Sequence, residues 1–243
     1  MIEVVNKLYT QRFLAKELKW SDLFQAVTYT QYEGDWGGVM RWYKIIYGET
    51  STLDLTRSED EILAAMKSNT RNEIKRAIKE GCEFEHNTDY AAFVPFFNDF
   101  AISKGLPERV DVHTLAKYDK TVITVAKKDG VVLAMHATVV NPKDGESLLL
   151  YSCSKRLDQT VDRKLIGWAN RFLHYRDFLL FKEMGATKYE WNGICTDPQR
   201  KEVYNISQFK LSFGSEPQKQ LNLRTPLFVL MKKAQKILST IKR

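Results

Sequence analysis

Residues 162–214 read DRKLIGWANRFLHYRDFLLFKEMGATKYEWNGICTDPQRKEVYNISQFKLSFG, and this stretch predicts a helix, a strand and a second helix in succession. Asp162 is a helix N-cap residue type, and apolar residues then recur at mainly helical spacing until Gly185 ends the run. A short strand is expected over 187–191, with a break at Asn192-Gly193. Such a crossover predicts an α/β site in which a helix N-terminus faces a bound anion.

Upstream of this stretch, three apolar runs predict strands over 121–127, 131–140 and 147–153. Their near-continuous apolar character indicates burial on both faces of a sheet. Helices are expected over 59–68, 71–80 and 89–104, the first two with capping boxes at Ser58 and Thr70, and strands over 24–32, 39–47 and 52–55. The predicted fold class is therefore α/β, with a central mixed sheet flanked by helices and an enlarged N-terminal half.

Several short motifs resemble the GNAT acyltransferase superfamily, and in particular its Fem-like branch. Lys164-Leu-Ile-Gly167-Trp-Ala169 is similar to the Gln/Arg-x-x-Gly-x-Gly/Ala turn of that superfamily. The runs that begin at Ala169, Phe181, Tyr189 and Phe209 resemble the branch's A-N-R-x-L-H-W, F-K, Y-D-F-G-G and F-K-x-x-F-G motifs. Tyr175, Glu190 and Asn192 depart from that pattern. The resemblance implies one GNAT-type domain, with an acceptor-side half at 1–118, an acyl-CoA-binding half at 119–224 and a C-terminal amphipathic helix at 225–243.

The resemblance also implies a coenzyme A thioester as cosubstrate and no permanently bound cofactor. The donor is expected where strands 147–153 and 187–191 diverge after a bulge in the earlier strand, with its pyrophosphate at the start of the helix that follows Asp162. A glycine at 167 would let the backbone come close to that group. The predicted donor-binding residues are Ser152, Cys153, Arg163, Lys164, Leu165, Ile166, Gly167, Asn170 and Asn192.

Four side chains are candidates for catalysis. By resemblance, Lys210 holds the carbonyl of the acyl donor; its alternative is a lysine on the wet face of a helix. His136 interrupts an apolar strand and is a candidate base, although a lone histidine there is more often a core residue. Tyr151 and Tyr204 are further candidates. The acceptor side is expected to involve Trp36, Arg71, Arg76, His174 and Glu190, with a loop anchor as the alternative for Trp36 and a solvated helix face for the two arginines.

The function that the resemblance implies is N-acylation of a nucleotide-linked amino sugar, such as a dTDP-3-amino-3,6-dideoxyhexose, in the synthesis of bacterial surface polysaccharide (O-antigen, lipopolysaccharide or capsule). One alternative is Fem-like aminoacyl transfer from tRNA to a cell-wall precursor. Another is a binding module without catalysis. The sequence leaves the oligomeric state open, and a homo-oligomer is one of the options.

Composition excludes several other classes. The 243 residues contain four histidines and three scattered cysteines, and neither shows a spacing typical of a metal site or of a disulfide framework. The N-terminal residues do not form a signal peptide, and no apolar run approaches the roughly 20 residues that cross a bilayer, so a cytoplasmic location is expected. The net charge of +7 equals the number of basic residues after Glu216, where no acidic residue follows. A broad nucleic-acid-binding face is therefore disfavoured.

The C-terminal segment predicts one more helix. Thr225 is an N-cap type, Pro226 suits the first helical position, and apolar residues then recur at i, i+3, i+4 and i+7. The favoured interpretation is a closing helix whose apolar stripe packs on the domain. The alternative is a peripheral contact with an anionic membrane.

Overall fold

The computed structural model describes residues 1–35, 38–156, 158 and 160–241 and divides the chain into two compact units. Unit 1 comprises residues 1–49 and 218–243, and unit 2 comprises residues 50–217. The expected single domain, with halves at 1–118 and 119–224 and a helix at 225–243, stays a prediction. Unit 1 is built from both ends of the chain, because strands near the two termini pair with each other.

Unit 2 is a mixed α/β fold, which confirms the predicted fold class. Its strands follow the order β4-β9-β8-β7-β6-β5, antiparallel from β5 to β8 and parallel between β8 and β9. The strands are β4 (Lys44–Asp54, shared with unit 1), β5 (Glu83–Asn87), β6 (Thr121–Lys128), β7 (Val131–Asn141), β8 (Glu146–Ser154) and β9 (Lys188–Ile194). The helices are α1 (Glu59–Ala65), α2 (Ser68–Lys79), α3 (Tyr90–Ser103), α4 (Val112–Ala116), η3 (Pro142–Asp144), α5 (Arg163–Glu183) and α6 (Lys201–Leu211).

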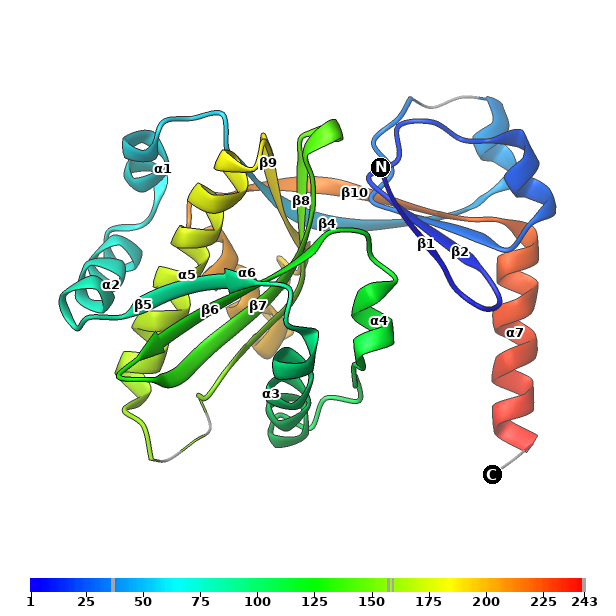
Figure 1. The fold of residues 1–243 in the computed structure, drawn as a ribbon. Helices are drawn as coiled ribbons and strands as arrows, with labels where there is room; N and C mark the ends of the chain where they lie inside the picture. The colour runs from blue at the N-terminus through cyan, green and yellow to red at the C-terminus, as the bar shows by residue number, and fades with distance from the viewer. Residues whose placement is uncertain (36–37, 157, 159, 242–243) are drawn as a thin grey trace. The chain divides into compact units, whose positions relative to one another are not determined.

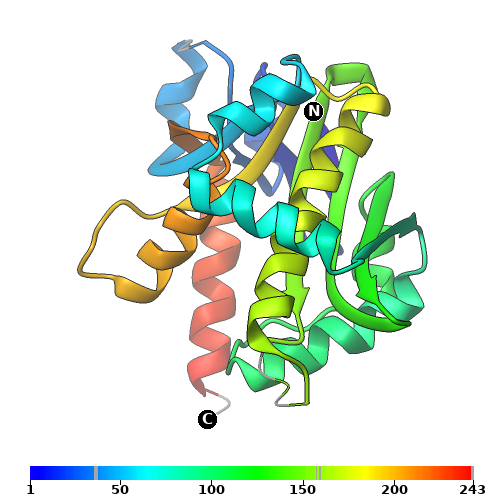
Figure 2. The same ribbon diagram turned by 90° about the vertical axis from the view of Figure 1, so that its left-hand side faces the viewer.

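The two faces of this sheet carry different helices, as Figures 1 and 2 show. Met135 and Ala137 of β7 pack in one hydrophobic cluster with Phe93 and Phe97 of α3. The residue between them, His136, points to the opposite face and contacts α5. This alternation follows from the period of two in a strand. It buries β7 on both faces, as its apolar run predicted.

The starts of the first two helices show how far local rules hold. Ser58 caps α1 with the predicted capping box, in which its backbone N–H donates to Glu61 and its side chain accepts from Glu61 N. The capping box predicted at Thr70 is wrong. Helix α2 begins at Ser68, and Thr70 is a buried residue inside it whose hydroxyl donates to Ser212 Oγ at 2.9 Å. A tertiary contact thus uses the side chain that the local pattern assigned to a cap.

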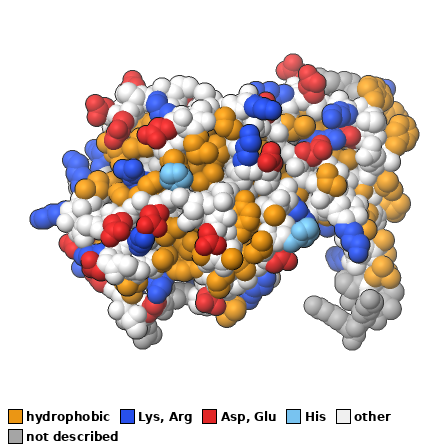
Figure 3. All heavy atoms as spheres, in the orientation of Figure 1, with side chains coloured by type: hydrophobic (Ala, Val, Ile, Leu, Met, Phe, Trp, Pro, Cys, Tyr) orange, Lys and Arg blue, Asp and Glu red, His pale blue; other side chains and the backbone are white. Residues whose placement is uncertain are grey.

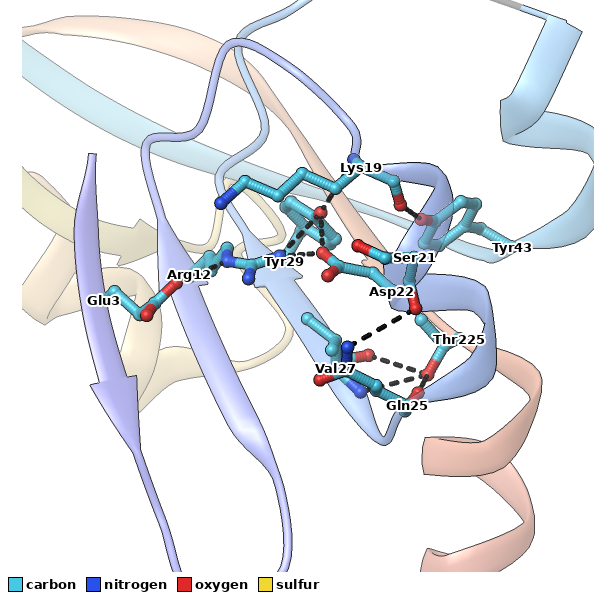
Figure 4. Close-up of polar contacts among 10 residues, drawn as sticks. All are labelled: Glu3, Arg12, Lys19, Ser21, Asp22, Gln25, Val27, Tyr29, Tyr43 and Thr225. Carbon is cyan, nitrogen blue, oxygen red and sulfur yellow. Dashed lines mark hydrogen bonds and ion pairs between the residues drawn. The ribbon is translucent and has the colours of Figure 1, made fainter.

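Unit 1 has the strand order β1-β2-β3-β10-β4. Arg12 and Asp22 form a buried ion pair beside Tyr29, whose hydroxyl accepts from Arg12 Nη1 at 3.0 Å (Figure 4). Besides its part of β4, the elements are β1 (Ile2–Val5), β2 (Thr10–Phe13), η1 (Trp20–Phe24), β3 (Val27–Thr30), η2 (Gly38–Trp42), β10 (Glu216–Arg224) and α7 (Pro226–Ile241).

Several strands were not predicted. Strands β1, β2 and β5 are only four or five residues long, too short for a clear periodic pattern, and β10 is mostly polar. Strand β9 continues through Asn192-Gly193, where a break was expected, although Asn192 adopts a left-handed backbone conformation with φ of 65°. In the described part of the chain, no helix combines the length and apolarity needed to cross a bilayer.

Candidate functional site

The sheet of unit 2 opens where β8 and β9 part. The two strands pair in parallel as far as Leu148 and Glu190. In the neighbouring ladder the β7–β8 register shifts between Ala137 and Thr138, and Leu150 is the extra residue on β8. We call the opening beyond Leu148 and Glu190 the fork. The strand divergence and the bulge lie where the sequence predicted them.

Asn192 spans the fork. Its side-chain Nδ2 donates to the Leu149 carbonyl on β8 at 3.1 Å, and its backbone N–H donates to Glu190 Oε1 at 2.9 Å. Asparagine tolerates the left-handed conformation that the backbone adopts at this position. Asn192 therefore sets the width of the fork by a side-chain bond at the point where the backbone ladder ends.

Lys210 reaches the end of β9 from α6. Its Nζ donates to the carbonyls of Trp191 and Gly193, both at 2.8 Å. Burial lowers the pKa of Lys210 to about 8, and the nearby carboxylate of Glu190 offsets part of that shift. The lysine predicted to hold a donor carbonyl thus lies at the fork, where its hydrogens are directed at carbonyls of the protein itself.

Behind the fork lies a buried polar cluster between β7 and α5. His136 Nδ1 is 2.6 Å from Asp177 Oδ2, and its Nε2 is 3.1 Å from Asn170 Oδ1. The His136 ring also stacks on that of His174, with the centroids 3.9 Å apart. Burial raises the pKa of Asp177, whereas burial together with the nearby His136 lowers the pKa of His174 well below its ordinary value.

This cluster does not present a base to solvent. The His136 and Asp177 side chains have no exposed surface, and His174 is 1% exposed. His174 contacts Trp191, Phe209 and other aromatic rings. The core interpretation weighed for His136 matches this placement, and the catalytic role stays a prediction.

The same three side chains are a potential metal-ligand group. His136, His174 and Asp177 each offer a ligand atom, and these atoms lie within 4.8 Å of one another. However, the two imidazole rings are stacked, and His136 Nδ1 already faces Asp177. Ligand atoms on a tetrahedral zinc ion, each about 2.0–2.3 Å from the metal, converge on one point. The nitrogen atoms of two stacked rings do not converge on one point in this way, and we assign no metal to this cluster.

The N-terminus of α5, where a donor pyrophosphate was expected, is capped by the protein. Asp162 Oδ1 accepts from the Lys164 backbone N–H at 2.9 Å. Gly167 lies inside the helix, and a Cβ added there would meet only Arg171 Nη1, at 3.9 Å. Arg163 and Lys164 are exposed. A diphosphate at this terminus would have to displace the carboxylate of Asp162 or accept its repulsion.

Other predicted donor-binding and catalytic residues are spread along β8, α5 and α6. Tyr151 packs on the α3 side, with its ring 4.8 Å from that of Phe97. Cys153 is buried and its Sγ contacts the Met135 carbonyl at 3.3 Å, and burial raises the pKa of its thiol. Ser152 stands opposite His136 in the β7–β8 register. Leu165, Ile166 and Tyr204 are half-buried or buried helix residues.

The residues predicted for the acceptor side also lie in different parts of unit 2. Arg71 Nη1 donates to carbonyls at the C-terminal end of α1, including Ala64 O at 3.1 Å, so it joins two helices. The guanidinium of Arg76 lies over the Trp168 ring at 5.4 Å. Glu190 is buried at the fork and accepts from the hydroxyl of Thr50. Trp36 lies outside the described residues.

A cavity of about 340 Å³ adjoins the far end of β8. It is lined by Phe96, Asp99, Phe100, Ser103, Ser154, Lys155 and Asp158. Ser154 lies five residues beyond Leu149, roughly 16 Å along an extended strand. The cavity could therefore hold a distal part of a substrate, and the reacting group would lie nearer the fork.

Two residues of the site were missed from the sequence. Asp177 completes a stripe of polar residues with Asn170 and His174 at i, i+4 and i+7 on α5, and this spacing was a usable signal. Arg171 pairs with Glu73 of α2 at 2.9 Å and lies over the Phe209 ring at 4.9 Å. Only the tertiary structure brings those partners together.

Comparison with solved structures identifies proteins with this fold. FemX superposes with a TM-score of 0.69 at 14% identity, over 95% of this chain and 85% of that chain. A C-terminal domain described as that of a lysylphosphatidylglycerol synthetase from Agrobacterium fabrum gives 0.61 at 11% identity, over 96% and 84% of the two chains. L-PGS from Bacillus licheniformis gives 0.58 at 13% identity, over 92% and 80%.

These TM-scores show that the chain shares its fold with the three proteins, which confirms the expected Fem-like fold. No protein-family model matches the sequence, and no curated protein does either.

Proposed function

We propose that this chain is an acyltransferase that moves an aminoacyl group from its tRNA ester to the amine of an acceptor. The observation that carries the proposal is the fork, where β8 and β9 part after Leu148 and Glu190 beside the bulge at Leu150. Beyond that point, the edge of β8 that faced β9 has no ladder partner among the described residues. Backbone groups along such an edge can hold the amide groups of an extended substrate.

The reaction needs little from the protein beyond position and a polar environment. The acceptor nitrogen attacks the ester carbonyl, a C–N bond forms, and the C–O bond to the ribose breaks. The proton lost by the amine ends on the ribose hydroxyl. Holding both reactants at the fork supplies the entropic part of the rate enhancement. In this proposal Asn192 and Lys210 are positioning residues, because they fix the fork through Leu149 O and the carbonyls of β9.

An aminoacyl ester is favoured over a coenzyme A thioester for an electrostatic reason. The Asp162 carboxylate accepts a hydrogen bond from the backbone N–H of Lys164 in the first turn of α5. This is the helix end where the pyrophosphate of a coenzyme A thioester was expected. A second anion at that position would be repelled. The names of the structural neighbours, FemX and lysylphosphatidylglycerol synthetase, lend support in the same direction.

The second candidate is transfer from acyl-CoA to a nucleotide-linked amino sugar such as a dTDP-3-amino-3,6-dideoxyhexose. It is favoured by exposed cations near the same helix start, Arg163 and Lys164. Lys164 also lies one helical turn before Trp168, and the guanidinium of Arg76 lies over the Trp168 ring. These charges could hold phosphate groups if Asp162 turned away.

The two donors are distinguished by one assay. The protein is incubated with tRNA charged with radiolabelled amino acids and a peptidoglycan-precursor peptide, and in parallel with acetyl-CoA and the amino-sugar nucleotide. We expect label to move from tRNA to the peptide, and the Asn192→Gly variant to lose most of that rate. Release of free thiol in the parallel reaction, without label transfer, would establish the second candidate. If neither product forms, the transferase assignment fails.

A further inference from the structure

Helix α7 is fixed to unit 1 at its first turn. Thr225 Oγ1 donates to Gln25 O at 2.7 Å and accepts from the backbone N–H group of Val27 at 3.0 Å (Figure 4). It also accepts from the backbone N–H group of Phe228 at 3.3 Å. Thr225 and Pro226 thus begin the helix as their residue types predicted. The ring of Phe228, which is 4% exposed, packs edge-on against Tyr9 at 5.2 Å.

The side of α7 that packs is not the apolar stripe. At about 100° per residue, Leu227, Leu230, Ile237 and Leu238 occupy one arc of the helix, and Phe228 lies about 80° outside it. Those four side chains are 44%, 63%, 61% and 59% exposed. The favoured sequence interpretation, in which the stripe packs on the protein, is therefore wrong. The stripe stays uncovered because the helix is held by Thr225 and Phe228, and its later turns extend away from the strands of unit 1 (Figure 1).

The opposite arc of the helix is cationic. Lys232, Lys233 and Lys236 are exposed, and no acidic residue occurs after Glu216 in the sequence. Hydrophobic and basic side chains both reach the surface along α7 in Figure 3. A helix with an exposed apolar arc and a lysine-rich arc has the pattern of a segment that lies in a membrane interface.

Aromatic side chains of unit 1 border the same helix. An open groove of about 380 Å³ is lined by Trp42, Tyr43, Lys44, Pro226, Val229, Leu230 and Lys233, so it continues the apolar arc at Leu230. Trp42 is 54% exposed. The short helix η1, which packs beside α7, exposes Trp20 by 62% and Phe24 by 83%. Tryptophan favours the boundary between water and hydrocarbon.

We propose that unit 1 docks on an anionic lipid bilayer through the apolar arc of α7, with Trp42 at the lipid boundary and the lysines among the headgroups. Charge favours this partner over a second copy of the chain. Two copies joined through α7 would bring two sets of lysines together with no carboxylate on the helix to pair with them. An anionic lipid surface instead attracts each lysine. The proposal is independent of the transferase assignment.

Vesicle sedimentation of the full chain tests this proposal. We expect binding to vesicles that contain phosphatidylglycerol, weaker binding at high salt, and little binding to phosphatidylcholine alone. Replacing Lys232, Lys233 and Lys236 with glutamine should weaken binding by about fivefold or more, since each lysine that reaches the headgroups contributes about fivefold. Leu230→Glu with Ile237→Glu should abolish it without unfolding, because both side chains are already exposed.

The matched control carries glutamine at three exposed lysines of unit 2, Lys75, Lys79 and Lys104, and should bind like the wild type. The emission of Trp42 is the difference between the fluorescence spectra of the wild type and of Trp42→Phe. Its maximum should shift to shorter wavelength when the protein binds vesicles. The proposal is overturned if the wild type shows no salt-sensitive binding, or if the control triple loses as much affinity as the α7 triple. It is equally overturned if light scattering shows a dimer that Leu230→Glu with Ile237→Glu dissociates.

Discussion

The Nδ1 atom of His136 on β7 lies 2.6 Å from the Oδ2 atom of Asp177 on α5, and neither side chain has any exposed surface. This contact joins the central helix of unit 2 to the middle of its sheet. The two buried groups depend on each other, because removing either one leaves the facing polar atom of the other without its partner in this contact.

We expect Asp177→Leu to lower the free energy of unfolding by about 3–5 kcal/mol, since it leaves the imidazole of His136 without its acceptor. The double variant His136→Leu with Asp177→Leu should recover part of that loss. Urea denaturation measures both, with Asp60→Leu on the surface of α1 as the control. A double variant no more stable than Asp177→Leu would contradict the coupling.

Lys210 should make stability depend on pH in the alkaline range. Burial lowers its pKa in the folded protein to about 8, below the ordinary value of 10.5. As pH rises through 8, the folded state therefore loses this proton before the unfolded state does. The unfolded state then binds more protons, so stability from this group increases with pH, by up to about 1.4 kcal/mol per pH unit.

We expect the stability of the wild type relative to Lys210→Met to rise between neutral pH and the ordinary lysine pKa. Denaturation of the two proteins at matched pH values gives this difference and cancels the other titrating groups. Lys201→Met, an exposed lysine of the same helix, should show no such trend. A relative stability that falls with pH would show that burial does not dominate at Lys210.

Two substitutions at Asn192 separate its backbone role from its side-chain role. Asn192→Gly keeps the left-handed conformation but removes the bond to Leu149 O, so we expect nearly unchanged stability and a transfer rate lowered about tenfold or more. Asn192→Ala removes the bond and also strains the backbone, at a further cost of about 1 kcal/mol. Equal transfer rates in wild type and Asn192→Gly would remove this residue from the site.

Gly167 and Asp162 discriminate between the two donors. Inside α5 a Cβ at Gly167 meets only Arg171, so Gly167→Ala should stabilise the protein by about 0.5–1 kcal/mol and leave aminoacyl transfer unchanged. Asp162→Asn retains a capping oxygen but removes the charge, and should not change aminoacyl transfer either. If Asp162→Asn instead strengthens coenzyme A binding, measured by calorimetry, and Gly167→Ala weakens it, the thioester candidate is favoured.

Much of the second unit was predictable because its signals are local or strongly apolar. The capping box of Ser58 and Glu61 acts within one helical turn, and Asp162 and Gly185 mark the two ends of α5. The runs that became β6, β7 and β8 are short and apolar on both faces, as expected for strands buried on both faces of a sheet. The fork was expected by resemblance to a known family, and the register between β8 and β9 confirms it.

The roles of individual site residues could not be predicted in the same way. Lys210 was expected to face a donor carbonyl, yet its hydrogens meet the carbonyls of Trp191 and Gly193, which lie on a separate element. His136 was placed in a core or a cleft, and only the position of α5 decides between them. A side chain's partner depends on which elements pack together, and residue type alone does not contain that information.

For this protein the sequence by itself determined the α/β class, the start of α1, both ends of α5 and the amphipathic character of α7, because capping, periodicity and burial on both faces act over a few residues. Tertiary structure decided that β10 joins β3, through contacts such as Thr28 with Leu223, and that the apolar arc of α7 stays exposed. In both cases the deciding partner lies nearly two hundred residues away along the chain, as the bonds of Thr225 to Gln25 and Val27 show. Periodicity identifies which arc of a helix is apolar, but the anchor at its first turn determines which arc meets the protein.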